Sequence, residues 1–461
     1  MRAESPIDAP PAPAPAGRAL GLTACTALVV GNMIGSGIFV LPASLAPLGA
    51  ISLAGWVLTS LGALVLALIF GRLARLVRRA GGPYAYVEAG FGPFMGFLIA
   101  WGYWIALWTG NAAVAVALAG YLGYLVPAVG ASQGLQLAVA LTAIWALTLV
   151  NIRGVKEAGA VQIVTTALKL APLLAIGVAG LFWIEPASFT PANVSGRSDM
   201  AAVSAAAALT LWAYLGLESA TVPAGDVVEP ERTIPRATLI GVSLAAAIYV
   251  AVTTVAIGVM PAEALAASSA PLADAARAMW GGLGGVLVAL GAVVSTFGTL
   301  NGFTLLSGQV PAAAARDRVF PRELGRLSRR GTPATALALS NALASALILL
   351  NFSGGMAAAF NFIILLAVMA SLLPYALCAL VELVLRLRGR EGADREGLPG
   401  VAALGGLGFA YAFWTLYGAG PETVFWGFLL ILAGVPLHVA QTWRAGAAAP
   451  VPATSLSETR T

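Results

Sequence analysis

The sequence predicts an all-α membrane protein of about twelve transmembrane helices, and three observations predict it. Hydrophobic residues make up 59% of the 461 residues and charged residues only 10%, which is more apolar surface than one soluble core can bury. Apolar runs of about 17–25 residues, long enough to cross a bilayer, recur along the whole chain. The basic residues between these runs are distributed as one topology requires.

The expected spans follow one another along most of the chain, with glycine and proline tolerated inside them. They cover residues 22–47, 51–70, 91–122, 135–150, 161–183, 200–222, 237–260, 283–311, 334–350, 356–385, 401–417 and 424–440. Several of these runs are short, so eleven spans is the alternative count.

The positive charges test this count. With twelve spans, the loops on the side of the N-terminus hold 22 of the 25 Lys and Arg residues, while the opposite loops hold only Arg197 and Arg277 and Lys169 falls within a span. Cytoplasmic loops carry such an excess, and one missed or added span would destroy the asymmetry. We therefore expect a multi-pass protein of a bacterial inner (plasma) membrane with both termini in the cytoplasm. The net charge of +5 then reflects topology rather than nucleic-acid binding.

Two spans are interrupted by glycine. The first contains three glycines between Gly31 and Gly37, and the sixth contains Gly216 beside Glu218. These spans hold corresponding places in two blocks of five, a pattern typical of secondary transporters with inverted repeats. The sequence thus predicts a five-plus-five inverted repeat with broken helices 1 and 6. The repeats cover about residues 20–184 and 200–388, and two further helices follow.

The break in the first span is the sharpest candidate binding site. A helix that restarts after a break presents unpaired N–H groups and the positive end of its dipole, and glycine lets a ligand approach closely. We expect a carboxylate on the Ser36 hydroxyl and on the amides around Gly37. The alternative is close helix packing through small residues, which the matching break at Gly216 disfavours.

The sixth span supplies the groups expected to bind the positively charged part of the same ligand. Carbonyls freed near Trp212 and Leu215, with Met33 opposite, are expected to accept hydrogen bonds from an α-ammonium group. Trp212 also offers an aromatic face to a cation, and an ordinary lipid-facing Trp is the alternative. Asn111, deep in the third span, is either a partner for the distal nitrogen of a substrate or a polar contact between helices.

Two ionisable residues lie well inside spans, where such side chains are costly and functional by default. Glu218 is a candidate proton-sensitive gate, with a structural hydrogen bond to backbone as the alternative. Lys169 is a candidate fixed or titrating cation, with snorkelling toward an interface as the alternative. Glu382, near the end of a span, is expected to be interfacial.

The sequence lacks the motifs of several classes of enzyme and of ATP-binding proteins. There is no HExxH, GxxxxGK[ST] or GxSxG motif, so we expect no enzyme and no use of ATP, and coupling from gradients or exchange. Cys25 and Cys378 have neither metal-site nor disulfide spacing. We expect no cofactor, no metal ion and no nucleic-acid partner.

Four motifs carry a resemblance to a known family. They are Gly31-Asn32 with Gly35-Ser36-Gly37, Gly81-Gly82-Pro83-Tyr84-Ala85-Tyr86, Leu211-Trp212 with Gly216-Leu217-Glu218-Ser219, and Asn301-Gly302-Phe303. From about residue 21 to residue 443 the chain resembles the amino acid–polyamine–organocation superfamily, and within it the basic amino acid/polyamine antiporters, which include arginine/agmatine antiporters. The resemblance implies a transporter domain over residues 20–443, often as a homodimer. The flanking residues 1–19 are then a disordered cytoplasmic tail and residues 444–461 a second cytoplasmic tail.

The resemblance also implies roles for the residues at the two breaks. Ser36 and Gly37 would bind the substrate carboxylate. Met33, Trp212 and Leu215 would surround the α-amine, with Trp212 stacked on the substrate side chain.

For the far end of the substrate, the resemblance implies that Ala106, Leu107 and Asn111 meet the guanidinium or amine. Two positions depart from the arginine/agmatine antiporters. Phe303 stands where they have the Trp of a middle gate, and it is a weaker partner for a cation. Ala367 stands where they offer a Ser to the guanidinium.

Gating and coupling residues follow from the same resemblance. Tyr103, Glu218 and Tyr375 match an outward gate, and Tyr84 matches a distal inward gate. Lys169 is absent from those antiporters and resembles a lysine of proton-coupled and heteromeric amino acid transporters in the superfamily.

We therefore expect a secondary active transporter that exchanges a cationic amino acid for its decarboxylated amine, as arginine/agmatine antiporters do. A proton-coupled permease for neutral amino acids is the alternative. A nutrient sensor derived from a transporter would need a signalling domain, for which the two tails are too short.

Overall fold

The structure is a computed structural model that describes residues 20–77, 82–154, 168–221, 227–351, 355–389 and 397–447. Within these ranges the chain is helical apart from its loops, and an isolated β-bridge joins Leu20 to Val227. Eleven helical segments are long and apolar enough to cross a membrane, and a shorter apolar helix, Leu168–Trp183, lies within the expected fifth span. The predicted all-α fold with about twelve spans is confirmed. Residues 1–19, residues 448–461 and the first part of the fifth span lie outside the described residues.

The first half of the described chain contains seven helices before the fifth span. They are α1 (Leu22–Met33), α2 (Ser36–Leu45), α3 (Ser52–Leu76), α4 (Pro83–Phe91), α5 (Pro93–Leu125), α6 (Pro127–Gly130) and α7 (Gln133–Arg153). The fifth span ends in two irregular turns, Ala175–Ala179 and Gly180–Trp183.

The second half of the described chain contains nine helices. They are α9 (Asp199–Leu211), α10 (Pro230–Val259), α11 (Ala262–Ala267), α12 (Pro271–Arg316), α13 (Ala334–Asn351), α14 (Met356–Leu387), α15 (Leu398–Gly418), α16 (Pro421–Leu432) and α17 (Gly434–Ala447). Helix α12 bends sharply at Gly281, whose φ of +75° favours glycine.

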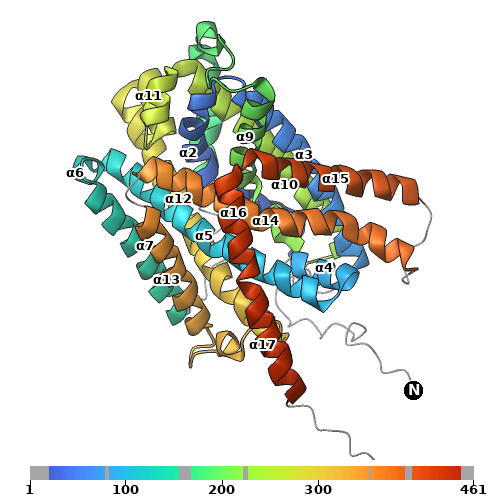
Figure 1. Ribbon diagram of the computed structural model, residues 1–461. Helices are drawn as coiled ribbons and strands as arrows, with labels where there is room; N and C mark the ends of the chain where they lie inside the picture. The colour runs from blue at the N-terminus through green and yellow to red at the C-terminus, as the bar shows by residue number, and fades with distance from the viewer. Residues whose placement is uncertain are drawn as a thin grey trace, which may run out of the picture.

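Helix α5 is the central helix of the bundle. It runs through the middle of the molecule and packs along α12 and α14, with α7 and α13 on its flank (Figure 1). Most of its side chains are buried, whereas α16 exposes Phe425, Trp426 and Phe428. A helix that is apolar on every side is buried in a bundle or faces lipid, so α5 belongs to the interior and α16 to the lipid boundary.

Both expected breaks are present. Helix α1 ends at Met33, Ile34 is extended, and α2 begins at Ser36. Helix α9 ends at Leu211, and a single 3-10 turn leads to Gly216, whose φ of +98° lies in the left-handed region.

The two breaks lie side by side. A Cβ added to Gly216 would lie 3.3 Å from Cβ of Asn32, and Nδ2 of Asn32 donates a hydrogen bond of 2.8 Å to Oγ of Ser219. The irregular backbone is therefore enclosed by protein, which is where a membrane protein tolerates it.

Candidate functional site

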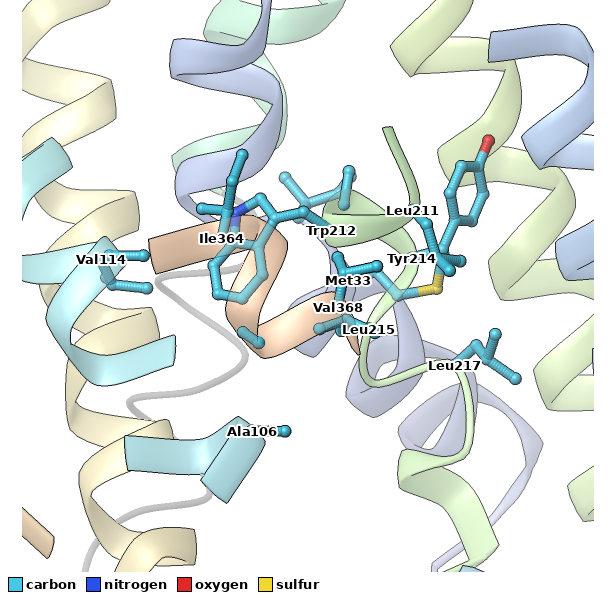
Figure 2. Packing of buried hydrophobic residues seen from close by; sticks show 14 of the residues in the cluster. Met33, Ala106, Val114, Leu211, Trp212, Tyr214, Leu215, Leu217, Ile364 and Val368 are labelled. Carbon is cyan, nitrogen blue, oxygen red and sulfur yellow. The ribbon is translucent and has the colours of Figure 1, made fainter. Parts of the chain in front are cut away.

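The two breaks enclose a small cavity of about 10 Å³, which is room for about one water molecule. Val114 of α5 lies at its wall with Met33, Trp212 and Leu215 (Figure 2), and Thr299 and Phe303 of α12 complete the wall. The cavity is lined by Asn32, Met33, Gly35, Ser36, Gly37, Val114, Trp212, Leu215, Thr299 and Phe303.

Six residues predicted to bind substrate meet at this cavity, namely Met33, Ser36, Gly37, Trp212, Leu215 and Phe303. All of the lining residues that the structure describes are uncharged. Backbone dipoles, hydroxyl groups and aromatic faces are therefore the groups that can bind a charged ligand here.

The start of α2 provides donors for an anion. The first N–H groups of a helix have no partner within the helix, and α2 starts at Ser36 on the cavity wall. Ser36 is only 1% exposed, and its Oγ has no hydrogen-bond partner among the described residues. A buried hydroxyl beside a helix N-terminus is suited to a carboxylate.

Gly37 keeps these donors accessible. A Cβ at this position would lie 3.0 Å from Cβ of Ala213 and 3.2 Å from Cδ1 of Trp212. Because these neighbours belong to the second break, a larger side chain would push the two breaks apart.

The C-terminal end of α1 carries the negative end of the helix dipole, and it faces a positively charged side chain of the same protein, Lys169. Lys169 is 2% exposed, and its Nζ donates a hydrogen bond to the carbonyl oxygen of Gly31. A positive charge at a helix C-terminus is stabilised by the helix dipole and by the carbonyls left unpaired there. Lys169 thus binds the end of α1 three residues before the break at Ile34.

Two aromatic rings close the cavity toward α5. The ring centroids of Trp212 and Phe303 lie 6.4 Å apart with an interplanar angle of 37°. Both rings contact Gly110, where a Cβ would lie 3.0 Å from Cε1 of Phe303 and 3.3 Å from Cη2 of Trp212. The absence of a side chain at Gly110 lets the two rings approach the helix.

The three residues predicted for the far end of the substrate lie outside this cavity. Ala106 and Leu107 are buried in α5, and Ala106 lies away from Trp212 (Figure 2). Asn111 donates a 3.0 Å hydrogen bond from Nδ2 to Oδ1 of Asn341 in α13, so it does join two helices. Its Oδ1 has no partner in the part of the chain that the structure describes.

The three residues predicted to form an outward gate, Tyr103, Glu218 and Tyr375, meet at the carboxylate of Glu218. The hydroxyl of Tyr375 donates to Oε2 of Glu218 over 2.8 Å, and Tyr103 is hydrogen-bonded to the same carboxylate. Glu218 is 1% exposed. A structural hydrogen bond to backbone alone is therefore too simple a description of its surroundings.

The trio lies on the same side of the breaks as the beginning of α1. Glu218 follows the break, Tyr103 lies in the first third of α5, and Tyr375 lies toward the Leu387 end of α14. Tyr84 is at this end too, where its hydroxyl donates to Oδ2 of Asp317 over 2.7 Å. This is the end that carries the basic loops, so the expected outward position of the trio conflicts with the expected cytoplasmic position of those loops.

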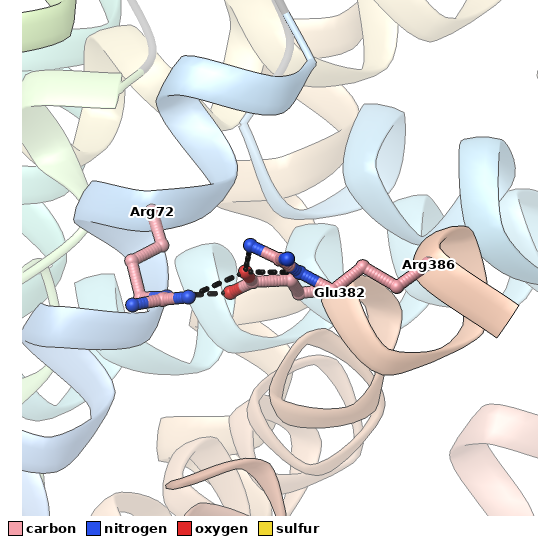
Figure 3. Close-up of polar contacts among 3 residues, drawn as sticks. All are labelled: Arg72, Glu382 and Arg386. Atoms are coloured by element: carbon pink, nitrogen blue, oxygen red, sulfur yellow. Dashed lines mark hydrogen bonds and ion pairs between the residues drawn. The ribbon is translucent and has the colours of Figure 1, made fainter. Parts of the chain in front are cut away.

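An ion-pair cluster lies near this end of the bundle (Figure 3). Nε and a terminal nitrogen of Arg72 in α3 each donate over 2.6 Å to the two oxygens of Glu382 in α14. Arg386 donates to the same carboxylate from one turn farther along α14. Glu382 is 5% exposed and lies five residues before the end of α14 at Leu387, so near the end of its span it is buried within an ion-pair cluster. The spacing from Glu382 to Arg386 was visible in the sequence, whereas the contact with Arg72 was not.

Thr299 is one of the cavity residues that were not predicted to bind substrate, together with Asn32, Gly35 and Val114. Its side chain lies against the first break, since a Cβ on Gly35 would be 2.8 Å from its Cγ2 and 3.1 Å from its Oγ1. Thr299 precedes Phe303 by four residues, which places both on one face of α12. That spacing was the available signal.

The sequence of the chain is similar to that of a known protein family. The family model described as amino acid permease matches residues 20–445. The chain belongs to the amino acid permease family. The predicted place in the amino acid–polyamine–organocation superfamily, among the basic amino acid/polyamine antiporters, is confirmed.

Three relatives cover most of the permease. It is 36% identical over 437 residues to the arginine/ornithine antiporter of Pseudomonas aeruginosa, which covers 91% of this chain and 90% of that protein. It is 34% identical over 362 residues to the cadaverine/lysine antiporter of Escherichia coli (strain K12), covering 77% and 81%. It is 30% identical over 421 residues to the putrescine transporter of the same strain, covering 91% and 95%.

Proposed function

We propose that this permease is a secondary antiporter that exchanges a cationic amino acid for its decarboxylated amine. One observation carries the proposal. The N-terminus of α2 and the unpartnered hydroxyl of Ser36 face a cavity between two broken helices, which suits the carboxylate of an amino acid. The α-ammonium group would then lie near Met33, Trp212 and Leu215, on the other side of the cavity.

The cationic side chain of the substrate is the second part of the proposal. Trp212 and Phe303 offer two aromatic faces to a positive charge, and Oδ1 of Asn111 is an unused acceptor within the described residues. Because Ala106, Leu107 and Asn111 lie beyond the cavity, they would contact the substrate only after the two rings separate. The names of the relatives support arginine or lysine as the amino acid, and we take arginine and agmatine as the pair to test.

Gating would begin at the end of the bundle where α1 starts. The Glu218 carboxylate holds Tyr103 and Tyr375 together, and Tyr84 closes the path beyond them through Asp317. We assign both contacts to the cytoplasmic side, in a bacterial inner membrane with both termini cytoplasmic. Lys169 would act as a fixed cation that holds the end of α1, and a homodimer is the expected assembly.

The test is counterflow in proteoliposomes. The purified chain is reconstituted, the vesicles are filled with arginine, agmatine, ornithine, cadaverine, leucine or buffer, and uptake of labelled arginine is followed. We expect rapid uptake against arginine and agmatine and background uptake against leucine and buffer. Uptake into buffer-filled vesicles driven by an inward-acid gradient would overturn the antiporter and favour the neutral permease, which the named relatives do not support. Exchange with ornithine but not agmatine would overturn exchange for the decarboxylated amine, because ornithine is itself a cationic amino acid, and would make the chain an exchanger of two cationic amino acids.

A further inference from the structure

We propose that Thr299 is a second hydroxyl ligand of the substrate carboxylate, and that it sets the preference for an amino acid over the corresponding amine. The inference rests on the proposed function and deepens it, because it concerns the one group that differs between the two exchanged substrates. The argument starts from the orientation of the Thr299 side chain.

The Thr299 hydroxyl is not used by its own helix. A Thr in a helix commonly donates its hydroxyl to the carbonyl four residues earlier. Thr296 does so, with Oγ1 donating to the Ala292 carbonyl over 2.7 Å. Thr299 is 7% exposed, yet its Oγ1 has no partner among the residues that the structure describes.

The Thr299 side chain lies against the break in the first span, with Cγ2 at 2.8 Å and Oγ1 at 3.1 Å from the position of a Cβ on Gly35. Thr299 packs on Gly35, the residue directly before Ser36, and both Thr299 and Ser36 line the cavity. Two buried hydroxyls that have no partner among the described residues therefore belong to residues lining one cavity beside the N-terminus of α2. Buried hydroxyl groups are normally satisfied, so a shared ligand that accepts hydrogen bonds is the simplest reason for the arrangement.

A carboxylate supplies what these donors need. It accepts hydrogen bonds at both oxygens, with about four lone-pair sites, so it can bind both hydroxyls and the amides at Ser36 and Gly37 together. The α-ammonium group of the same substrate offers donors only and cannot replace it. The donors around Thr299 and Ser36 thus recognise the part of arginine that agmatine lacks.

The amine would bind without this contact. A cavity of about 10 Å³ holds about one water, and one water could accept a hydrogen bond from each hydroxyl when no carboxylate is present. Loss of the Thr299 hydroxyl should therefore weaken the amino acid far more than the amine.

The experiment compares both substrates on three variants of the full-length protein. Thr299→Val removes the hydroxyl and keeps the shape, and Thr299→Ser keeps the hydroxyl. Thr296→Val is the matched control, because it removes a hydroxyl of the same helix that is bonded to its own backbone. Dissociation constants for arginine and agmatine are measured by calorimetry on detergent-purified protein whose folding is checked by size exclusion.

We expect Thr299→Val to raise the Kd for arginine about tenfold or more, as for a lost hydrogen bond to a charged group, and to leave that for agmatine within about twofold. Thr299→Ser and Thr296→Val should stay close to wild type for both ligands. Thr299→Ala replaces Thr299→Val if the latter does not fold. Equal losses for arginine and agmatine, or no loss for either, would overturn the proposal.

A failure of the proposed function is distinguishable from this result. If wild type binds neither arginine nor agmatine, the exchange proposal fails before Thr299 is tested. If arginine and ornithine bind and agmatine does not, the same variants are measured with ornithine and putrescine, which differ by the same carboxylate.

Discussion

The two sides of the paired breaks differ in the hydrogen bonding of the polar groups that lie beside them. On the side where α1 begins, the Glu218 carboxylate accepts a hydrogen bond from Tyr375, and Glu382 is bound by two arginines. On the side where α2 begins, the hydroxyls of Ser36 and Thr299 have no partner in the described structure. Because an unsatisfied buried group is costly, the first side is built to close on itself and the second is built to receive a ligand.

The largest expected effect comes from filling the ligand side. Gly37→Val would place methyl groups where Ala213 and Trp212 already approach to 3.0–3.2 Å of a Cβ, so it would block the amides of α2 and separate the breaks. We expect arginine binding to weaken at least about a hundredfold, more than one lost charged hydrogen bond explains. Calorimetry on folded protein is the measurement, and Gly21→Val, at a glycine with no atom within 4 Å of its Cβ position, is the control. Normal binding by folded Gly37→Val would place the carboxylate elsewhere.

A smaller effect is expected from the cation that supports the end of α1. Lys169→Ala leaves the Gly31 carbonyl buried without its donor, which costs about 1–3 kcal/mol. We expect exchange to fall about tenfold while the protein stays folded, and exchange by wild type to need no pH gradient. The measurement is uptake into empty and arginine-filled proteoliposomes, with and without the gradient. Robust gradient-driven uptake by wild type that is abolished in Lys169→Ala would make Lys169 a titrating group of a symporter.

The transport rate should depend on pH through Glu218, on the side of the breaks where α1 begins. Protonation turns this carboxylate from an acceptor into a partial donor, which weakens the hydrogen bonds that it accepts from Tyr375 and Tyr103 and favours opening. Transport is therefore expected to rise as the pH falls, by about threefold if the lost stabilisation is that of one hydrogen bond. Glu218→Gln should flatten the pH–rate curve, and Tyr375→Phe should change the rate without removing the pH dependence. A curve in Glu218→Gln that matches wild type would remove Glu218 from the gate.

The smallest effect is expected at Phe303, which with Trp212 forms the aromatic wall of the cavity. Phe303→Trp would strengthen the attraction for a cation by about 0.5–1 kcal/mol, or about two- to fivefold in Kd. The gain should appear for arginine and agmatine and not for a neutral amino acid such as leucine. Binding measured for all three ligands checks this, and an equal change for leucine would show that the ring acts by shape alone.

Much of the fold followed from the sequence because membranes impose simple rules. A span needs a certain apolar length, and the predicted and observed spans agree to within a few residues except in α3, α10 and α12, which extend farther. The breaks were predictable because Gly35 and Gly216 permit backbone that other residues resist. Five of the six predicted residues at the cavity lie at those two breaks, and Phe303 was predicted from the family resemblance.

The remaining contacts depend on which helices face one another. The pair Arg72–Glu382 joins positions 310 residues apart, and no local periodicity reports such a contact. Thr299 is one of many small polar residues in apolar spans, and only its packing on Gly35 distinguishes it. The outward side of the gate was an implication of the family resemblance, and it conflicts with the expected cytoplasmic position of the basic loops at the same end of the bundle.

The hydrogen bond between Asn32 and Ser219 has a mechanical consequence. It links two half-helices that are 187 residues apart in the chain, one leading to the donors of α2 and the other carrying Glu218. A rotation of α1 therefore displaces the segment that holds the carboxylate of the gate. Substrate binding at α2 and opening of the gate at Glu218 then both depend on movement of α1. Their rates should therefore vary together rather than independently.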